Sequence, residues 1–128
     1  MRISGGQALA QYDFLGGERI PNALSVRHIE PIFQRLATSL AQIPEVRYIK
    51  IFPERLTASN VLSQDGKKNP VVKVGGEDIV GIELLIDRSA KVVQFYALTS
   101  AVTGCGRKMV EAVIDATPAD WQLAVVMH

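Results

Sequence analysis

The sequence has little cysteine and little histidine, and this scarcity excludes two classes of site. Cys105 is its one cysteine, so no internal disulfide framework can form, and a lone thiol is typical of a reducing compartment. His28 and His128 are its two histidines, and neither stands at metal-ligand spacing from a second histidine, a cysteine or a carboxylate. We therefore expect both histidines at the surface and no metal site.

The sequence also lacks an excess of charge and a long apolar run. Its 14 Lys and Arg residues nearly balance 13 Asp and Glu residues, so there is no electrostatic reason to expect a nucleic-acid or anionic-membrane partner. The first residues contain no apolar core of a signal peptide, and no stretch reaches the length of a membrane span. These features predict a cytoplasmic protein that binds neither nucleic acid nor membrane.

The remaining composition is that of one globular domain. Apolar residues make up 48% of the 128 residues and charged residues 21%, enough for a single hydrophobic core. Residues 1–24 are rich in glycine and polar side chains, which predicts a loosely structured N-terminal arm with a short strand or helical turn around Leu9–Phe14. The whole chain, residues 1–128, is expected to be one domain.

Apolar periodicity predicts the first half of the fold. Helical spacing of apolar residues indicates an amphipathic helix over roughly 27–42, and Pro31, acceptable only in a first turn, moves its start toward Glu30. A β-branched and aromatic run predicts a strand at 46–52. Residues 53–70 are expected to form a long irregular connection, with a helical turn near 54–62 as the alternative.

The second half is predicted to be strands followed by a strand–helix–strand unit. Residues 71–74 and 79–86 are typical of a hairpin, and further strands are expected at 92–98 and 121–127 with a helix ending near Ala116 between them. Hairpin-joined strands are antiparallel, whereas a strand–helix–strand crossover is parallel and right-handed. The predicted fold class is therefore α+β, with a mixed, mostly antiparallel sheet of about five strands and helices packed on it.

The stretch between the last two predicted strands carries the clearest functional signal. Gly104 and Gly106 flank Cys105 where a buried strand turns into a helix, and such a turn exposes the first backbone N–H groups of the helix to an anion. Arg107 and Lys108 oppose the helix dipole in that first turn, and an anion above them would remove the conflict. The alternative is a tight turn without a ligand.

Residues 71–127 resemble the GNAT-type N-acetyltransferases. VVKVGGEDIVGIELLI is similar to that family's first meander hairpin, VVQFYAL to its cofactor-side strand, GCGRKMVEAVI to its pyrophosphate turn and helix, and WQLAVV to the following strand. The resemblance implies acetyl-coenzyme A as cofactor, with Thr103, Gly104, Cys105, Gly106, Arg107 and Lys108 around its pyrophosphate. It also implies that Tyr96–Leu98 run beside the pantetheine arm.

The sequence departs from the family pattern in three places. The loop between Leu98 and Gly104 is shorter than in the family. Ala101 stands where the family prefers Gln or Arg at the start of the turn motif. The family's last helix and final hairpin have no counterpart up to His128. The chain is then a fragment of a longer acetyltransferase, a protomer completed by its partner, or a protein with only a local likeness.

Glu83 and Tyr96 are the candidates for acid–base chemistry. Glu83 is the one carboxylate inside an apolar strand, and alternation places it with Leu85 on the face opposite Ile82 and Leu84. It would act as a general base through water if that face lines the site, although a solvated outer face is the expected environment. Tyr96 is either a hydroxyl in the site or a packed aromatic. Cys105 is expected to be a buried, inert thiol rather than a nucleophile.

Two hypotheses for function remain. The first is an acyl-coenzyme A binding protein, an N-acetyltransferase that acts on a small amine. The second is a non-catalytic, homo-oligomeric α+β protein that binds a small ligand or a protein partner. The apolar strand at 121–127 predicts a homodimer in either case, because an uncovered apolar edge is commonly paired.

Overall fold

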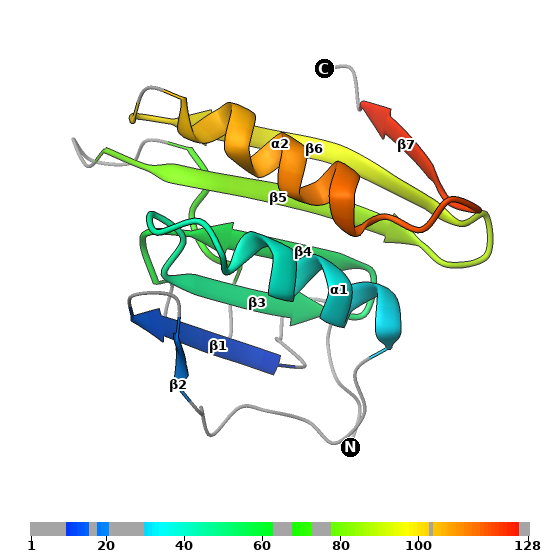
Figure 1. The fold of residues 1–128 in the computed structure, drawn as a ribbon, viewed down its shortest axis with the longest axis horizontal. Helices are drawn as coiled ribbons and strands as arrows, with labels where there is room; N and C mark the ends of the chain where they lie inside the picture. The colour runs from blue at the N-terminus through cyan, green and yellow to red at the C-terminus, as the bar shows by residue number, and fades with distance from the viewer. Residues whose placement is uncertain are drawn as a thin grey trace.

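Seven strands of the described chain form one mixed sheet. The computed structural model describes residues 10–15, 18–20, 30–62, 68–72, 78–102 and 104–125. The elements are β1 (Ala10–Leu15), β2 (Glu18–Ile20), α1 (Pro31–Leu40), β3 (Tyr48–Phe52), β4 (Arg55–Ser59), β5 (Val80–Asp87), β6 (Val92–Ser100), α2 (Cys105–Ala116) and β7 (Gln122–Val125). The strand order is β2-β1-β3-β4-β5-β6-β7, and every pair is antiparallel except β6 and β7 (Figure 1).

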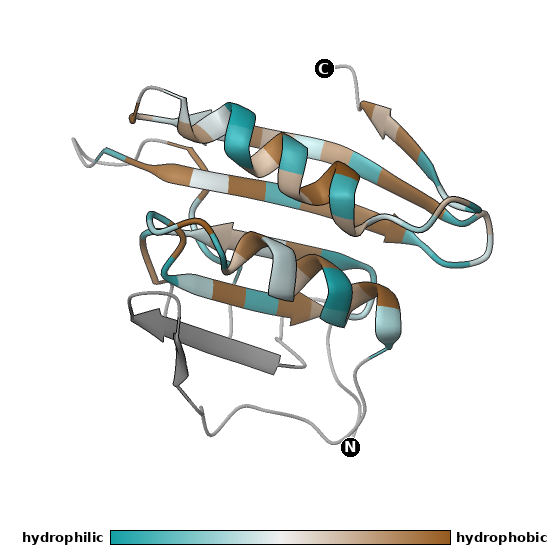
Figure 2. Cartoon of the chain, in the orientation of Figure 1, coloured by the Kyte–Doolittle hydropathy of each residue, from teal (hydrophilic) through white to brown (hydrophobic). Residues whose placement is uncertain are grey.

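Both helices pack on the same face of the sheet, side by side (Figure 1). Alternate residues of the strands point at them, so the apolar positions of β3, β4 and β5 and the inner faces of α1 and α2 form one core (Figure 2). The core residues of β5 are Val80, Ile82, Leu84 and Ile86. Because each strand contributes every second residue, the other residues of these strands must lie on the opposite face.

Side-chain hydrogen bonds fix the two helices to each other. The Arg35 Nε of α1 donates to the Ala116 carbonyl at 2.9 Å, and the Ser39 hydroxyl donates to the Ala112 carbonyl at 2.7 Å. Ala116 is the last residue of α2, where carbonyl oxygens have no partner within the helix and the dipole is negative. Arg35 therefore satisfies the C-terminal end of α2, which holds the whole helix in place on the sheet.

Residues 68–72 cross the opposite, second face of the sheet. The Asn69 side-chain amide donates to the Tyr48 carbonyl at 3.1 Å, and the Asn69 backbone N–H donates to the Thr57 hydroxyl at 3.3 Å. Gly81 lies under this segment, where a Cβ atom would stand 3.1 Å from Val71 Cα and 3.1 Å from the Ala58 carbonyl oxygen. The absence of a side chain at Gly81 thus permits the close approach of the segment.

Two strand predictions of the sequence were wrong, and both concern the second face. Residues 55–59 form β4 rather than an irregular connection or a helical turn, because Pro53 and Glu54 make a short hairpin turn after β3. Val71 and Val72 lie in no strand, and β5 pairs with β4 on one side and with β6 on the other. Residues 73–77, where the predicted hairpin turn falls, lie outside the described residues.

The predicted fold class, both predicted helices and the parallel pairing of the last two strands are confirmed. The class is α+β with a mixed, mostly antiparallel sheet, wider than predicted because β1, β2 and β4 were not counted. The first helix begins at Pro31 with Glu30 as its N-cap, and the second ends at Ala116. The last unit, β6–α2–β7, has parallel strands as predicted. Within the N-terminal arm, the segment around residues 9–14 takes the strand alternative, as β1.

Gly81→Ala is predicted to destabilise the protein by about 1–2 kcal/mol, because the added methyl group meets two backbone atoms that cannot rotate away. The measurement is urea unfolding, read as a shift in midpoint at constant slope. Gly106→Ala is the matched control, since its Cβ would meet Ser100 Cβ at an ordinary 3.4 Å. Equal stability of the two variants would contradict a close approach at Gly81.

Candidate functional site

The turn between β6 and α2 is built around a glycine in the left-handed region. Gly104 is the N-cap of α2 with φ 85°, a conformation that other residues adopt only under strain. It is exposed, and a Cβ atom there would meet nothing within 4 Å. The turn is therefore open at Gly104. Thr103, the first of the residues predicted to surround the pyrophosphate, lies outside the described residues.

One backbone N–H group of the predicted pyrophosphate turn is hydrogen-bonded within the protein. The Cys105 N–H donates to the Val102 carbonyl at 3.1 Å, and the Ser100 hydroxyl donates to the same oxygen at 2.6 Å. The Cys105 amide is thus committed to the turn, contrary to the expectation that it faces an anion. Gly106 is half-buried beside Ser100 and Leu98, so it brings the helix close to β6.

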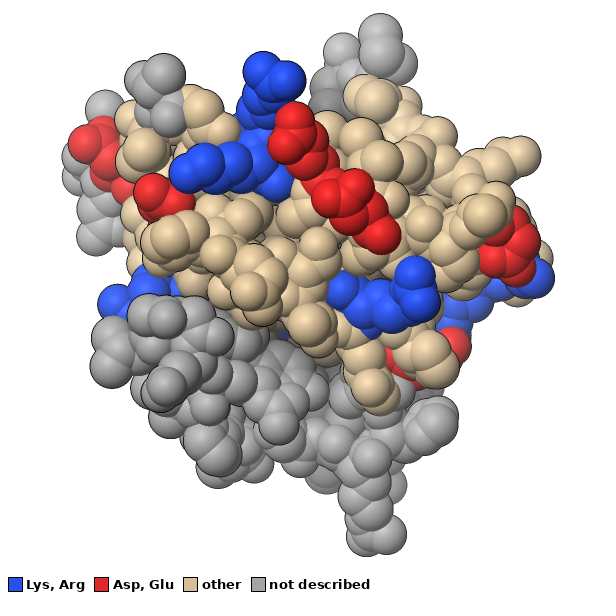
Figure 3. Space-filling view, in the orientation of Figure 1, with Lys and Arg blue, Asp and Glu red and all other residues tan. Residues whose placement is uncertain are grey.

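The first turn of α2 is electropositive. It contains no acidic residue, and no side chain caps its N-terminus. Arg107 and Lys108 are both exposed, and the Arg107 Nε is paired with Glu111 one turn later at 3.0 Å. Figure 3 shows basic side chains gathered on the outer surface over this end of the molecule, with acidic ones beside them. Lys108 also borders a shallow hollow between the helices, of about 430 Å³, with Ser39 and Asp115.

The Cys105 thiol is in an environment that opposes ionisation. The residue is buried in the core beneath the start of α2. Burial, followed by the nearby Glu45 carboxylate, raises the pKa of the Cys105 thiol. These are the properties of an inert, packed thiol, as expected from the sequence.

Tyr96 forms a β-bulge one residue beyond the described pairing of β6 with β7. The pairing of β5 with β6 passes from Glu83↔Ala97 to Leu84↔Phe95, so Tyr96 is the extra residue of the bulge on the β6 side. The described pairing of β6 with β7 covers only Val92–Phe95. The bulge therefore lies between the part of β6 that pairs with β7 and the turn at Gly104.

Glu83 is buried on the second face, which corrects the expectation of a solvated surface. It is 1% exposed, and its carboxylate accepts from Lys68 Nζ at 3.1 Å and pairs with Arg55 Nε at 3.2 Å. The two cations are 40% and 46% exposed, so they connect the carboxylate to the surface. A carboxylate can be buried in this way because it is paired and hydrogen-bonded. Its position opposite Leu84 in the alternation was predicted correctly.

The structure brings the two candidate acid–base residues to neighbouring strands. Glu83 pairs with Ala97, the residue after Tyr96, whereas Gly104–Lys108 lie beyond the far end of β6. The contacts of the Glu83 carboxylate in the described chain are with cations, an arrangement that favours a structural role over proton abstraction. Tyr96 is half-buried at the bulge.

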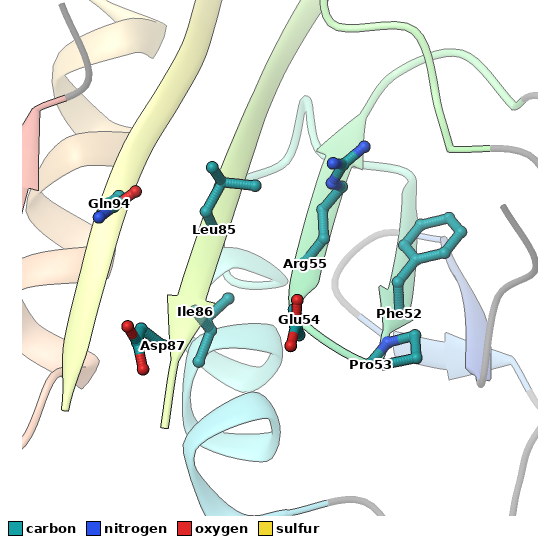
Figure 4. A pocket seen from close by; sticks show the side chains of 8 residues that line it. All are labelled: Phe52, Pro53, Glu54, Arg55, Leu85, Ile86, Asp87 and Gln94. Atoms are coloured by element: carbon teal, nitrogen blue, oxygen red, sulfur yellow. The ribbon is translucent and has the colours of Figure 1, made fainter. Parts of the chain in front are cut away.

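Sequence reasoning missed a cavity on the second face, which we call the hairpin pocket. It has a volume of about 470 Å³ (Figure 4). Its described lining residues are Phe52, Pro53, Glu54, Arg55, Leu85, Ile86, Asp87 and Gln94. Four of them form one continuous row of cross-strand neighbours, Phe52↔Arg55↔Leu85↔Gln94. The row requires β4, and residues 55–59 were predicted to be a loop, so no sequence signal pointed to it.

The described residues give no group of three or more His, Cys, Asp or Glu side chains suited to a metal ion. His28 and His128, predicted to lie at the surface, fall outside them. Neither described helix has the length and apolar character needed to cross a membrane. No protein-family model, curated protein sequence or solved structure matches this chain.

Glu83→Gln is predicted to destabilise the protein by about 1–3 kcal/mol, because a buried ion pair loses its charged acceptor while both cations can still reach water. Urea unfolding measures the change. Glu111→Gln removes a similar pair from the surface of α2 and should change stability by less than about 0.5 kcal/mol. If both variants lose the same small amount, Glu83 does not hold the second face together.

Proposed function

We propose that the protein binds acyl-coenzyme A at the β6–α2 turn, with acetyl-coenzyme A as its cofactor. The observation that carries this proposal is the open left-handed turn at Gly104, followed by a helix that begins with two cations and no acidic residue. A pyrophosphate above Gly104, Gly106, Arg107 and Lys108 would neutralise charges that otherwise oppose the helix dipole. The Cys105 amide, bonded within the turn, takes no part.

The part of β6 beyond its described pairing with β7 is where we place the pantetheine arm. Beyond Phe95 the described β7 no longer pairs with β6, and β6 continues to Ser100 before the turn. Main-chain groups along the edge of a strand are suited to the amides of an extended partner. The arm would then run beside Tyr96–Leu98, from the bulge toward the pyrophosphate at Gly104, as the resemblance to GNAT-type enzymes implies.

Acyl transfer to a small amine is the chemistry we propose for this arrangement. Bound acetyl-coenzyme A would supply a thioester acyl group: the amine nitrogen would take the acyl group and release one proton to water, and the coenzyme sulfur would leave as a thiol after it takes up a proton. Tyr96 is at the bulge, beside the proposed end of the pantetheine arm, where its hydroxyl can donate that proton. Glu83, held by Arg55 and Lys68, would position β5 against the bulge.

Acetyl-coenzyme A is predicted to stabilise the folded protein and to bind the Arg107→Ala variant about tenfold more weakly, because a charge-assisted contact with phosphate is lost. Calorimetric titration measures the affinity, and thermal unfolding with excess ligand checks it. Lys91→Ala is the matched control. Lys91 is also exposed and paired with an acidic residue, Asp120, but it stands at the opposite end of β6. Absence of binding, or equal weakening by both substitutions, would refute the coenzyme site.

We also propose that the chain forms a homodimer through the outer edge of β7. β7 is the last strand of the described sheet, and its Val125 and Leu123 side chains are 70% and 39% exposed. Both residues pair with core-facing residues of β6, so they extend the apolar face of the sheet beyond α2. Two such edges joined about a two-fold axis would cover these side chains.

Light scattering during size-exclusion chromatography is predicted to give twice the mass of one chain for the wild type. For Val125→Lys it should give the mass of one chain. A lysine on an edge strand hinders strand pairing between copies. Val72→Lys is the control, because Val72 is 54% exposed in the segment on the second face, away from β7. A monomeric wild type, or a dimer that survives Val125→Lys, would count against this interface.

A further inference from the structure

We infer that the hairpin pocket binds a small zwitterion, an α-amino acid with an apolar side chain. Figure 4 shows the lining side chains with opposite charges at two ends: the Arg55 guanidinium at one end, and the Glu54 and Asp87 carboxylates at the other. Phe52, Pro53 and Leu85 supply apolar surface beside these charges. Such an arrangement matches a ligand that carries an anionic group, a cationic group and an apolar side chain.

The Arg55 guanidinium, at the positive end of the hairpin pocket, has further N–H donors. A guanidinium offers five N–H groups in a planar fork, and the described ion pair of Arg55 uses Nε, which faces Glu83 at 3.2 Å. The four N–H groups on the two terminal nitrogens have no partner among the described residues. Glu83 also fixes the orientation of the side chain. Two parallel N–H groups of an oriented guanidinium are suited to both oxygens of a carboxylate.

The negative end has spare acceptors. Asp87 Oδ1 accepts from the Ala90 N–H at 3.0 Å, which orients the carboxylate and leaves its second oxygen available. The Glu54 carboxylate has no partner within the described chain, and its backbone carbonyl accepts from the Ile86 N–H at 2.8 Å, which ties the turn to β5. An ammonium group, with three donors, can use both carboxylates. Gln94, also without a described partner, offers a neutral donor and acceptor on the β6 side.

The rest of the lining is apolar and of suitable size. Phe52, Pro53 and Leu85 supply the apolar surface on the second face, and Phe52 is buried. A cavity of about 470 Å³ is within the usual range for small-molecule sites, and it has room for an amino acid the size of leucine or phenylalanine. Apolar contact in such a site gives affinity, and the two charged ends determine orientation.

This inference stands without the coenzyme proposal. It concerns binding to the free protein, and its test contains no coenzyme. If both hold, the bound α-amine is the acyl acceptor, because Gln94 of the pocket is two residues before the Tyr96 bulge on the same strand.

The test is calorimetric titration of the full chain with L-leucine and L-phenylalanine, followed by two derivatives of whichever binds more tightly. The methyl ester removes the negative charge, and the N-acetyl derivative removes the positive charge. We expect each derivative to bind at least tenfold more weakly than the free amino acid. The inference is overturned if neither amino acid binds at 10 mM, or if either derivative binds as tightly as its parent.

Substitutions locate the site without disturbing the buried ion pair of Glu83. The double variant Glu54→Gln and Asp87→Asn should weaken binding at least tenfold, because it removes both carboxylates and keeps an acceptor for the Ala90 N–H. Asp78→Asn is the control, since Asp78 is also exposed and precedes β5 as Asp87 ends it. Unchanged affinity in the double variant, or an equal loss in the control, would place the ligand elsewhere.

Discussion

A carboxylate buried in the middle of a sheet must be neutralised, and much of the second face follows from this requirement. Glu83 obtains one cation from β4 and another from the segment that crosses the face. Lys68 is adjacent to Asn69, whose two hydrogen bonds fasten the segment to β3 and β4. The same carboxylate pairs with the Nε of Arg55, a residue that also lines the hairpin pocket. Burial of one charge thus organises both the covering of the sheet and the polarity of the cavity.

The sequence predicts well those elements whose periodicity is set by the core. The spacing of Phe33, Leu36 and Leu40 defines α1, and the run at 92–98 defines β6, because these residues pack against apolar neighbours whatever the rest of the chain does. β4 was missed because its second-face residues are polar: Arg55, Thr57 and Ser59 resemble a loop until Glu83 and Asn69 are placed next to them. Local composition does not contain that information.

The features of the candidate site also fall into those that the sequence could predict and those that it could not. The Gly-Cys-Gly turn and its cations could be recognised, since the glycine conformation and the helix start are local properties. The internal bond of the Cys105 amide, the burial of Glu83 and the hairpin pocket could not, because each depends on residues far along the chain. Arg35 illustrates the point, since it holds the C-terminal end of α2 from a helix 81 residues away in the sequence.

The bulge in β6 resembles an insertion into an otherwise regular strand. Val93 and Phe95 pack toward the helices, and Leu98, three positions later, again lies beside Gly106 of α2. If Tyr96 were deleted, Phe95 and Ala97 would become adjacent, opposite Leu84 and Glu83, and the alternation would continue without interruption. The alternation of core-facing and second-face residues on the two sides of the bulge therefore does not depend on Tyr96.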